Sequence, residues 1–345
     1  MAPPASGATL VELMIAIAIG LLLLTALAAL FAYNSNARGE IDRTSQQIEN
    51  GRYGLEVLRD DIHQAGFFAG YDGSAATKQA TTACVPRAGV ALSAANLGWQ
   101  ASPALVPLSI YGYAGGDLPG TETCITNQKT NTDVLVVRRV VSEPLPVTTM
   151  AAGTYPADYF MQVSTCADAT VDAPTIPFVI ATGASATPFT LHAKNCIALA
   201  TVRKLVVRAY YVGTCSVCTG GGDGIPTLRM VELSAGAMPN GGVPLVEGID
   251  SMRVEYSIDN DANGTVDSIK RCKAGVDACS LADWTNVMAV KVHLLARNLG
   301  KTIDYSDAKT YNMGLAGTIA APGDGYKRHL YSALVIAHNQ TGPRE

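Results

Sequence analysis

Residues 6–32 read SGATLVELMIAIAIGLLLLTALAALFA and decide how the fold begins. Glu12 is the one charged residue in this stretch, and the twenty residues from Leu13 to Ala32 carry no charge. A helix rises ~1.5 Å per residue, so these twenty residues would span ~30 Å, the thickness of the hydrocarbon core of a bilayer. The stretch therefore predicts a membrane-spanning helix with a single carboxylate near its start.

The sequence after residue 32 continues the helical pattern. Ile41, Ile48, Leu55 and Ile62 recur every seven residues with polar residues between them, which is the pattern of an apolar stripe on one helix face. No proline occurs between residues 8 and 65, and the glycine-rich run AGFFAGYDG begins at residue 65. We predict one helix over residues 8–65, with residues 8–32 in the membrane and the second half packed on a globular domain.

A secretory signal peptide or a plain membrane anchor is the simpler interpretation of the N-terminus. A signal peptide combines a basic start, an apolar core of 7–15 residues and a cleavage site of small residues. Here the apolar run is longer, and charged residues that continue the helix follow it: Arg38, Glu40, Asp42 and Arg43. The pattern therefore favours a permanent helix.

Residues 66–345 have the composition of a β-rich domain. The 33 glycines and 17 prolines of the chain favour short strands joined by turns. Met252, Val254, Tyr256 and Ile258 alternate with polar residues, as in a half-buried strand. The segments with strand character are 134–141, 178–181, 189–191, 205–212, 228–233, 252–258, 287–295 and 330–337. We predict an α+β fold: a long N-terminal helix packed on a β-rich head over residues 66–345.

Eight cysteines all follow the apolar run, at Cys84, Cys124, Cys166, Cys196, Cys215, Cys218, Cys272 and Cys279. An even number on one side of a membrane segment is typical of a disulfide-bonded exported domain. Eight cysteines allow 105 pairings, so spacing does not fix the connectivity. Two close pairs, Cys215 with Cys218 and Cys272 with Cys279, could each close a local loop. Cys84 with Cys124 and Cys166 with Cys196 would then be the long-range pairs in sequence order.

The segment DNDANGTVD, residues 259–267, resembles a calcium-binding loop. Oxygen side chains stand at its first, third, fifth and ninth positions and a glycine at its sixth, as hard oxygen ligands and a sharp turn require. The twelfth position is Lys270 where a bidentate Glu is usual. The segment has two interpretations: a calcium site formed by Asp259, Asp261, Asn263, the Thr265 carbonyl and Asp267, or a polar hairpin turn at Asn263–Gly264. Calcium is the only cofactor that the sequence suggests.

Other motifs argue against enzymatic chemistry. CSVC at residues 215–218 precedes TGGGDG, so it does not open a helix as a redox motif would, and a structural disulfide is favoured over a zinc site. The chain has no nucleophile elbow, phosphate-binding loop or dinucleotide fingerprint. The net charge of −4 is unfavourable for phosphate, so we expect no nucleic-acid partner.

Glu12 requires a partner, because a carboxylate inside lipid costs ~2.5–3.5 kcal/mol on insertion scales. Cleavage after Gly7 would create a free amine at Ala8, four residues from Glu12. In a filament, the carboxylate of one subunit could pair with the amine of its neighbour.

The run GATLVELM, residues 7–14, resembles the type IV prepilin cleavage motif. The resemblance implies that a prepilin peptidase removes the leader 1–7 by cutting between Gly7 and Ala8 and methylates the new amine, and that Glu12 registers subunits during assembly. This chain departs from the family in two ways: Ala8 stands where Phe or Met is usual, and the leader MAPPASG has no Lys or Arg.

Further segments resemble PilW-type minor pilins. They are ENGRYGLEVLRDDIHQAGFFAGY, TDVLVVRRV, VRAYYV, WTNVMAVKVHLLARN and YKRHLYSALVIAHN, at residues 49–71, 132–140, 207–212, 284–298 and 326–339. The resemblance implies a non-enzymatic subunit that primes pilus assembly and sits at the filament tip.

The same resemblance implies where the protein is found and what it contacts. Its partners would be other minor pilins, the major pilin, the prepilin peptidase, the inner-membrane assembly platform and a tip adhesin. The chain would first cross the inner membrane once, with its head in the periplasm, and then enter the filament. The alternatives are a minor pseudopilin of a type II secretion system and a membrane-anchored adhesive protein.

Overall fold

The computed structural model describes residues 9–71, 76–85, 93–150 and 155–341. The chain divides into two compact units, residues 1–46 and 47–345. The first unit contains most of one helix, α1 (Leu10–Gln64), and the second unit contains the last part of that helix and the whole head. The predicted helix is therefore present, and the predicted α+β fold is confirmed.

The N-terminal unit consists of helical residues whose apolar side chains are exposed. Leu10 to Phe31 present large apolar side chains all around the helix, such as Leu22 at 70% and Phe31 at 77% exposure. Part of this helix reaches a mean hydropathy of 2.8, so by length and composition it can cross a membrane. Such exposure is unfavourable in water and favourable in lipid.

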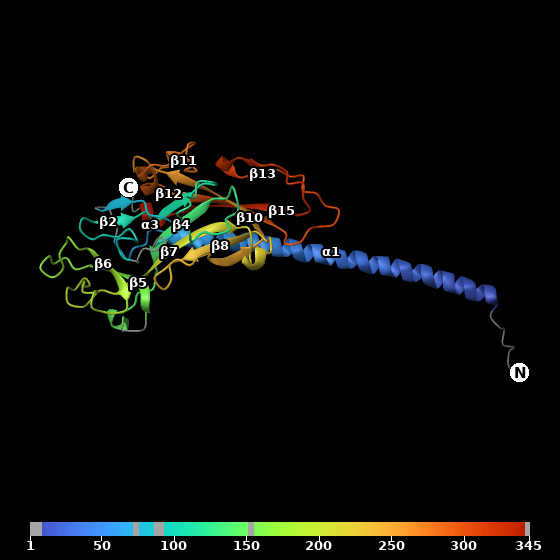
Figure 1. The fold of residues 1–345 in the computed structure, drawn as a ribbon, viewed down its shortest axis with the longest axis horizontal. Helices are drawn as coiled ribbons and strands as arrows, with labels where there is room; N and C mark the ends of the chain where they lie inside the picture. Colours follow the sequence, from blue (N-terminus) through green and yellow to red (C-terminus); the bar gives the residue numbers. More distant parts are fainter. Residues whose placement is uncertain (1–8, 72–75, 86–92, 151–154, 342–345) are drawn as a thin grey trace. The chain divides into compact units, whose positions relative to one another are not determined.

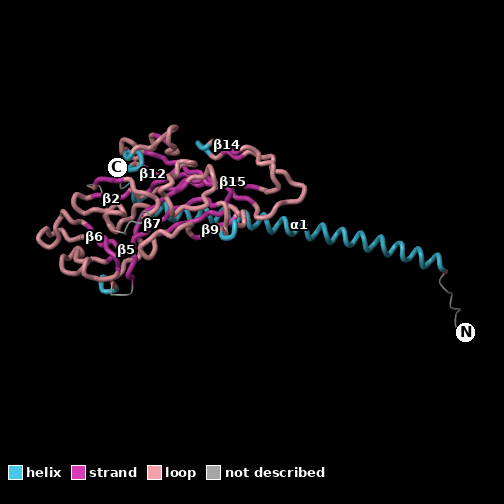
Figure 2. Tube along the Cα trace, viewed as in Figure 1, coloured by secondary structure: helices cyan, strands magenta, loops and turns pink. Residues whose placement is uncertain are grey.

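The described residues of the head form fifteen strands, most of them in two main sheets (Figures 1 and 2). The larger sheet has the order β3-β4-β7-β5-β6, with β8 paired to β7 and β9 to β8. Its strands are β3 (Ile110–Tyr113), β4 (Val134–Val140), β5 (Tyr155–Val163), β6 (Phe178–Gly183), β7 (Val202–Gly213), β8 (Thr227–Glu232) and β9 (Val243–Glu247). Each strand pair in it is antiparallel.

The smaller sheet has the order β11-β10-β12-β15, and its strands are also antiparallel. They are β10 (Ile249–Ile258), β11 (Ser268–Lys270), β12 (Val287–Arg297) and β15 (Arg328–Ile336). Two short pairs, β1 (Thr77–Gln79) with β2 (Leu105–Pro107) and β13 (Tyr311–Asn312) with β14 (Thr318–Ile319), complete the strands. Two short helices complete the described elements: α2 (Leu281–Thr285) precedes β12 in the chain, and α3 (His338–Thr341) follows β15.

One core joins the second half of α1 to both sheets. Leu58 and Ile62 of the helix are fully buried with Leu135 of β4, Met252 of β10 and Val292 of β12. Apolar stripes on helix and strands thus meet in one cluster, as the periodicity predicts. The stripe is shorter than expected, because Ile41 and Ile48 are 64% and 41% exposed.

A second core lies on the opposite face of the larger sheet. Alternate residues of β4 point to different cores: Leu135 and Val137 belong to the core that contains α1, and Val134 and Val136 to the other. This second core also holds Trp99 and the Cys84–Cys124 disulfide. Because both faces of β4 are covered, the strand has a continuous apolar sequence.

Two helical glycines bring α1 close to the strands. A Cβ on Gly51 would lie 2.2 Å from the Tyr331 ring, and a Cβ on Gly54 would lie 3.2 Å from Leu294. Both glycines are buried, whereas Gly39 has nothing within 4 Å of its Cβ position. The motif ENGRYG therefore carries its glycines where the sheet approaches the helix backbone.

The predicted strands agree with the structure except at residues 189–191. Phe189 is buried in a small separate cluster, but its backbone forms no strand. The sequence does not predict eight strands of the described residues: β1, β2, β3, β5, β9, β11, β13 and β14. The longest of them is β5, whose sequence YPADYFMQV begins with Pro and Asp among apolar residues. The alternate apolar residues of 252–258 all enter the core, as predicted. The strand is not half-buried, however, because Glu255 and Ser257 on its other face are only 4% and 5% exposed.

A buried charge network anchors α1 to the larger sheet. Asp61 is 3% exposed, and its Oδ1 accepts hydrogen bonds from Arg139 Nε and Arg208 Nη1, both at 3.0 Å. Arg139 Nη2 lies 2.8 Å from the same oxygen. Tyr210 donates its hydroxyl to Asp61 Oδ2 at 2.6 Å, and Arg208 also binds Glu232 Oε2 at 2.6 Å.

The phenol in this network is a neutral donor. Burial raises the pKa of Tyr210, and the negative charge of Asp61 raises it further. Tyr210 is therefore protonated at neutral pH, and its hydroxyl donates a hydrogen bond to the Asp61 carboxylate. Asp61 on the helix is satisfied by three side chains from β4 and β7.

We predict that Asp61→Asn destabilises the protein by about 3–5 kcal/mol, because removing one partner of a buried ion pair leaves the other charges uncompensated. The neighbouring variant Asp60→Asn is the matched control, since Asp60 is exposed and should change stability by less than about 0.5 kcal/mol. Urea unfolding of the full chain in detergent, followed by the fluorescence of buried Trp99 and Trp284, measures both. Equal midpoints for the two variants would contradict this role of Asp61.

Candidate functional site

Glu12 lies in the first turn of α1, at the start of the apolar segment. Its Oε2 accepts hydrogen bonds from Thr9 N at 2.8 Å and Thr9 Oγ1 at 3.1 Å, and Thr9 Oγ1 accepts one from Glu12 N at 3.3 Å. This reciprocal arrangement is a capping box, in which Thr9 and Glu12 satisfy amides that the helix itself leaves free. The sequence carries the signal for this capping box as Thr-x-x-Glu at residues 9–12, a pattern outside the predictions above.

The capping box gives Glu12 a local role in addition to any role between subunits. One carboxylate oxygen, Oε2, accepts both hydrogen bonds from Thr9, so both functions would use the same side chain. Gly7 and Ala8, the predicted cleavage site, lie outside the described residues. Cleavage and methylation there stay predictions from the sequence.

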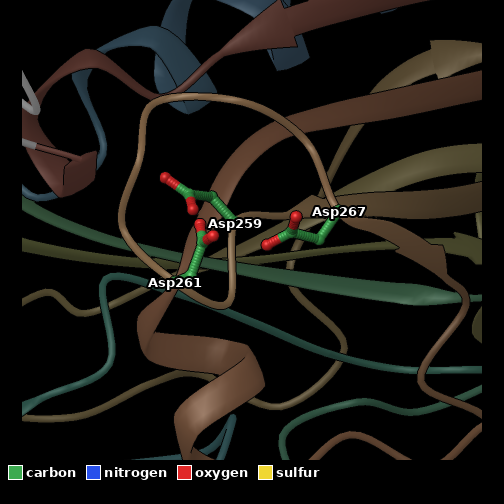
Figure 3. Close-up of side chains that lie close together, drawn as sticks. All are labelled: Asp259, Asp261 and Asp267. Atoms are coloured by element: carbon green, nitrogen blue, oxygen red, sulfur yellow. The ribbon is translucent and has the colours of Figure 1, made fainter.

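The predicted calcium loop connects β10 to β11. Ile258 of β10 pairs with Ser268 of β11, so residues 259–267 form the loop of an antiparallel hairpin. Ligand oxygens of Asp259, Asp261 and Asp267 lie within 4.8 Å of one another, and Figure 3 shows the three carboxylates around the loop. Three of the five predicted ligands are therefore close together.

Of the other two predicted ligands, Asn263 is hydrogen-bonded by the amide and the hydroxyl of Thr265, and the Thr265 carbonyl, the predicted ligand atom, takes no part in these contacts. Asn263 Oδ1 accepts hydrogen bonds from Thr265 N at 2.8 Å and Thr265 Oγ1 at 2.6 Å. Asp259 is fully buried and accepts hydrogen bonds from the amides of Asn263 and Gly264 at 3.2 and 3.0 Å. These contacts shape the hairpin turn by themselves, so the geometry accommodates both interpretations of the loop.

Lys270, which occupies the position of the usual bidentate Glu, points to another partner. Its Nζ lies 3.0 Å from Asp283 Oδ1 in the first turn of α2. The ammonium group is thus paired with a carboxylate outside the loop. The candidate site therefore has three close carboxylates and lacks the usual bidentate Glu. The protein supplies fewer ligands there than a standard calcium loop does.

The eight cysteines form four disulfides, and no described cysteine is free. The bonds join Cys84 to Cys124, Cys166 to Cys196, Cys215 to Cys218 and Cys272 to Cys279. CSVC is therefore a disulfide that closes a loop after β7, not a metal site. Disulfides of this number suit an exported domain.

Comparison with known proteins relates this architecture to type IV pili. Residues 209–339 match the family model "Type IV Pilus-assembly protein W", PilW. This range covers strands β8 to β15, less than half of the chain, and includes the segments at residues 284–298 and 326–339 that resemble the family. The predicted resemblance to PilW is thereby confirmed. No curated protein sequence matches the chain.

A search of solved structures finds a type IV-like pilin from Thermus thermophilus. The match has 15% sequence identity and covers 62% of this chain and 80% of the other. Its TM-score is 0.29, a value at which the two structures do not establish a common fold. The relation to type IV pilus assembly therefore rests on the family match, and the long apolar helix fits a membrane-anchored pilin.

We predict that the full chain binds Ca²⁺ at the hairpin loop and that Asp261→Asn weakens this binding at least tenfold, because one of three converging charges is lost. Asp304→Asn is the matched control, since Asp304 is an exposed aspartate in a different loop. Titration calorimetry measures the affinity, and added Ca²⁺ should raise the urea midpoint of the wild-type chain. If Ca²⁺ shifts neither quantity, the loop is a hairpin turn only.

Proposed function

We propose that this protein is a non-enzymatic minor pilin of a type IV pilus, of the PilW type. The observation that supports this most directly is the lone carboxylate in the first turn of an apolar, membrane-length helix in a chain whose head matches PilW. A carboxylate in lipid is expensive and is functional by default. A plain anchor would gain stability by replacing it.

In this proposal, a prepilin peptidase cuts between Gly7 and Ala8, and the new amine is methylated. The mature helix begins at Ala8, crosses the inner membrane over residues 8–32 and keeps the head, residues 66–345, in the periplasm. The assembly platform then extracts the subunit, and the apolar helix exchanges lipid for the helices of neighbouring subunits. Since both surroundings are apolar, extraction does not expose this helix to water.

The charge pair sets the register of assembly. The Glu12 carboxylate of one subunit would accept the cationic N-terminus of an adjacent subunit, and both charges would be neutralised in a medium where their attraction is strong. Partners of the helix are the major pilin and the other minor pilins. The head, held by four disulfides, would contact other minor pilins and a tip adhesin as the complex primes assembly and remains at the tip.

Glu12→Ala should stay in the membrane but be absent from sheared pili, because the apolar helix is intact and the counter-charge for a neighbour is missing. Glu40→Ala is the matched control, since Glu40 lies on the same helix beyond the apolar run, next to Arg43. It should enter pili as the wild type does. Immunoblots of membrane and sheared-filament fractions give both results.

Glu12→Gln separates the charge from the helix cap. Glutamine can replace glutamate in a capping box but carries no charge. If the charge pair is what matters, Glu12→Gln fails to enter pili just as Glu12→Ala does. Normal incorporation of Glu12→Gln would leave the cap as the role of this residue and would contradict the charge-pair mechanism.

A further inference from the structure

A cleft of about 580 Å³ lies in the head between residues 116 and 131. Its volume falls within the range of small-molecule sites in proteins, ~300–1,000 Å³. The larger share of its lining is apolar, with Leu118, Pro119 and Ile125 contributing, and hydroxyl and amide side chains make up the rest. It lies apart from the calcium loop and from α1, so the proposed function does not use it.

The loop that forms the cleft is held rigidly by covalent and buried polar contacts. The Cys84–Cys124 disulfide fixes its middle. Glu122 is 3% exposed and accepts hydrogen bonds from Cys84 N at 2.7 Å and Tyr113 OH at 2.9 Å. Because a preorganised loop loses little conformational entropy on binding, this rigidity favours a ligand site.

Backbone hydrogen bonds fasten the rest of the loop to β7 and its neighbours. Cys124 O accepts from Gly241 N, and Asn127 O accepts from Thr214 N, both at 2.8 Å. Lys129 N donates to Val212 O at 2.8 Å. The cleft is therefore a fixed part of the head surface.

The two charged side chains that line the cleft already have partners within the head. Glu122 is bound by an amide and a phenol as described, and Lys129 Nζ is paired with the Asp250 carboxylate. Lys129 is charge-paired, and the Glu122 carboxylate is buried with both oxygens hydrogen-bonded, so neither side chain is free to pair with an ionic ligand. An anionic or cationic ligand would find no counter-charge among the described lining residues, so the cleft suits a neutral ligand.

Unused hydrogen-bonding groups remain at the surface of the cleft. Thr123, Thr130 and Asn131 are exposed, and their side chains make no hydrogen bond among the residues that the structure describes. A threonine hydroxyl and an asparagine amide can each donate and accept. Sugar hydroxyls do the same, and the C–H faces of a sugar ring match apolar groups such as Leu118 and Pro119.

We infer that this cleft binds a neutral oligosaccharide. Thr123, Thr130 and Asn131 hydrogen-bond the sugar hydroxyls, and Leu118 and Pro119 pack against the ring. Two sources present this chemistry to an exported protein: N-acetylated glycan of the cell-wall type and non-acetylated polysaccharide of external surfaces. The binding does not depend on whether the chain enters a filament.

The test uses the full chain in a zwitterionic detergent without a sugar headgroup, because maltoside detergents would compete for the cleft. Calorimetry is carried out with chitotetraose, cellotetraose and an acidic oligogalacturonate of the same length. We expect at least one of the two neutral sugars to bind and the acidic one not to bind. Chitotetraose alone would indicate a cell-wall type of ligand, and cellotetraose alone a surface polysaccharide.

The double variant Thr123→Val/Thr130→Val should weaken the binding of that sugar by about tenfold or more, since it removes two hydroxyl groups without changing side-chain shape. Thr175→Val, an exposed threonine in another loop, is the matched control and should bind as the wild type does. The inference is overturned if neither neutral sugar binds at ~10 mM, if the acidic sugar binds as well as the neutral ones, or if the double variant binds unchanged.

Discussion

The head is organised around one buried carboxylate on the helix. Asp61 accepts hydrogen bonds from two arginines and a tyrosine of β4 and β7, two adjacent strands inside the larger sheet. An unpaired charge at 3% exposure would be costly, so the helix must enter the head in the register that brings Asp61 to Arg139 and Arg208. Leu58 and Ile62, in adjacent turns, supply the apolar contact. Gly51 and Gly54 allow the strands to approach one turn earlier.

The sequence predicts the elements of this fold better than the contacts between them. Periodicity is a local property, so the helix and the strand at residues 252–258 are visible in it. Strand β5 is not visible, because Pro156 and Asp158 interrupt its apolar pattern. Phe189 is apolar and buried, but its backbone forms no strand. The long-range disulfides form in sequence order, but spacing alone left the other pairings open.

The candidate sites also differ in how far the sequence predicts them. Asp61, Arg139, Arg208 and Tyr210 come from three elements, so no short motif indicates that they meet. The cleft at residues 116–131 depends on a disulfide and on backbone contacts with β7, and its polar sequence looks like an ordinary loop. The calcium loop, in contrast, is a contiguous motif, and the structure brings its three aspartates together. Thr9 and Glu12 are only three residues apart, so their capping box could be predicted from the sequence.

In the proposed function the two ends of the chain have different tasks: the apolar helix with its one acid serves assembly, and the disulfide-bonded head makes the contacts. The central claim is that Glu12 meets an amine created by cleavage. N-terminal mass spectrometry of the protein from membranes and from sheared filaments tests this most directly. We predict a mature chain that begins with N-methylated Ala8 in both fractions. A working protein that retains Met1 to Gly7 would contradict it.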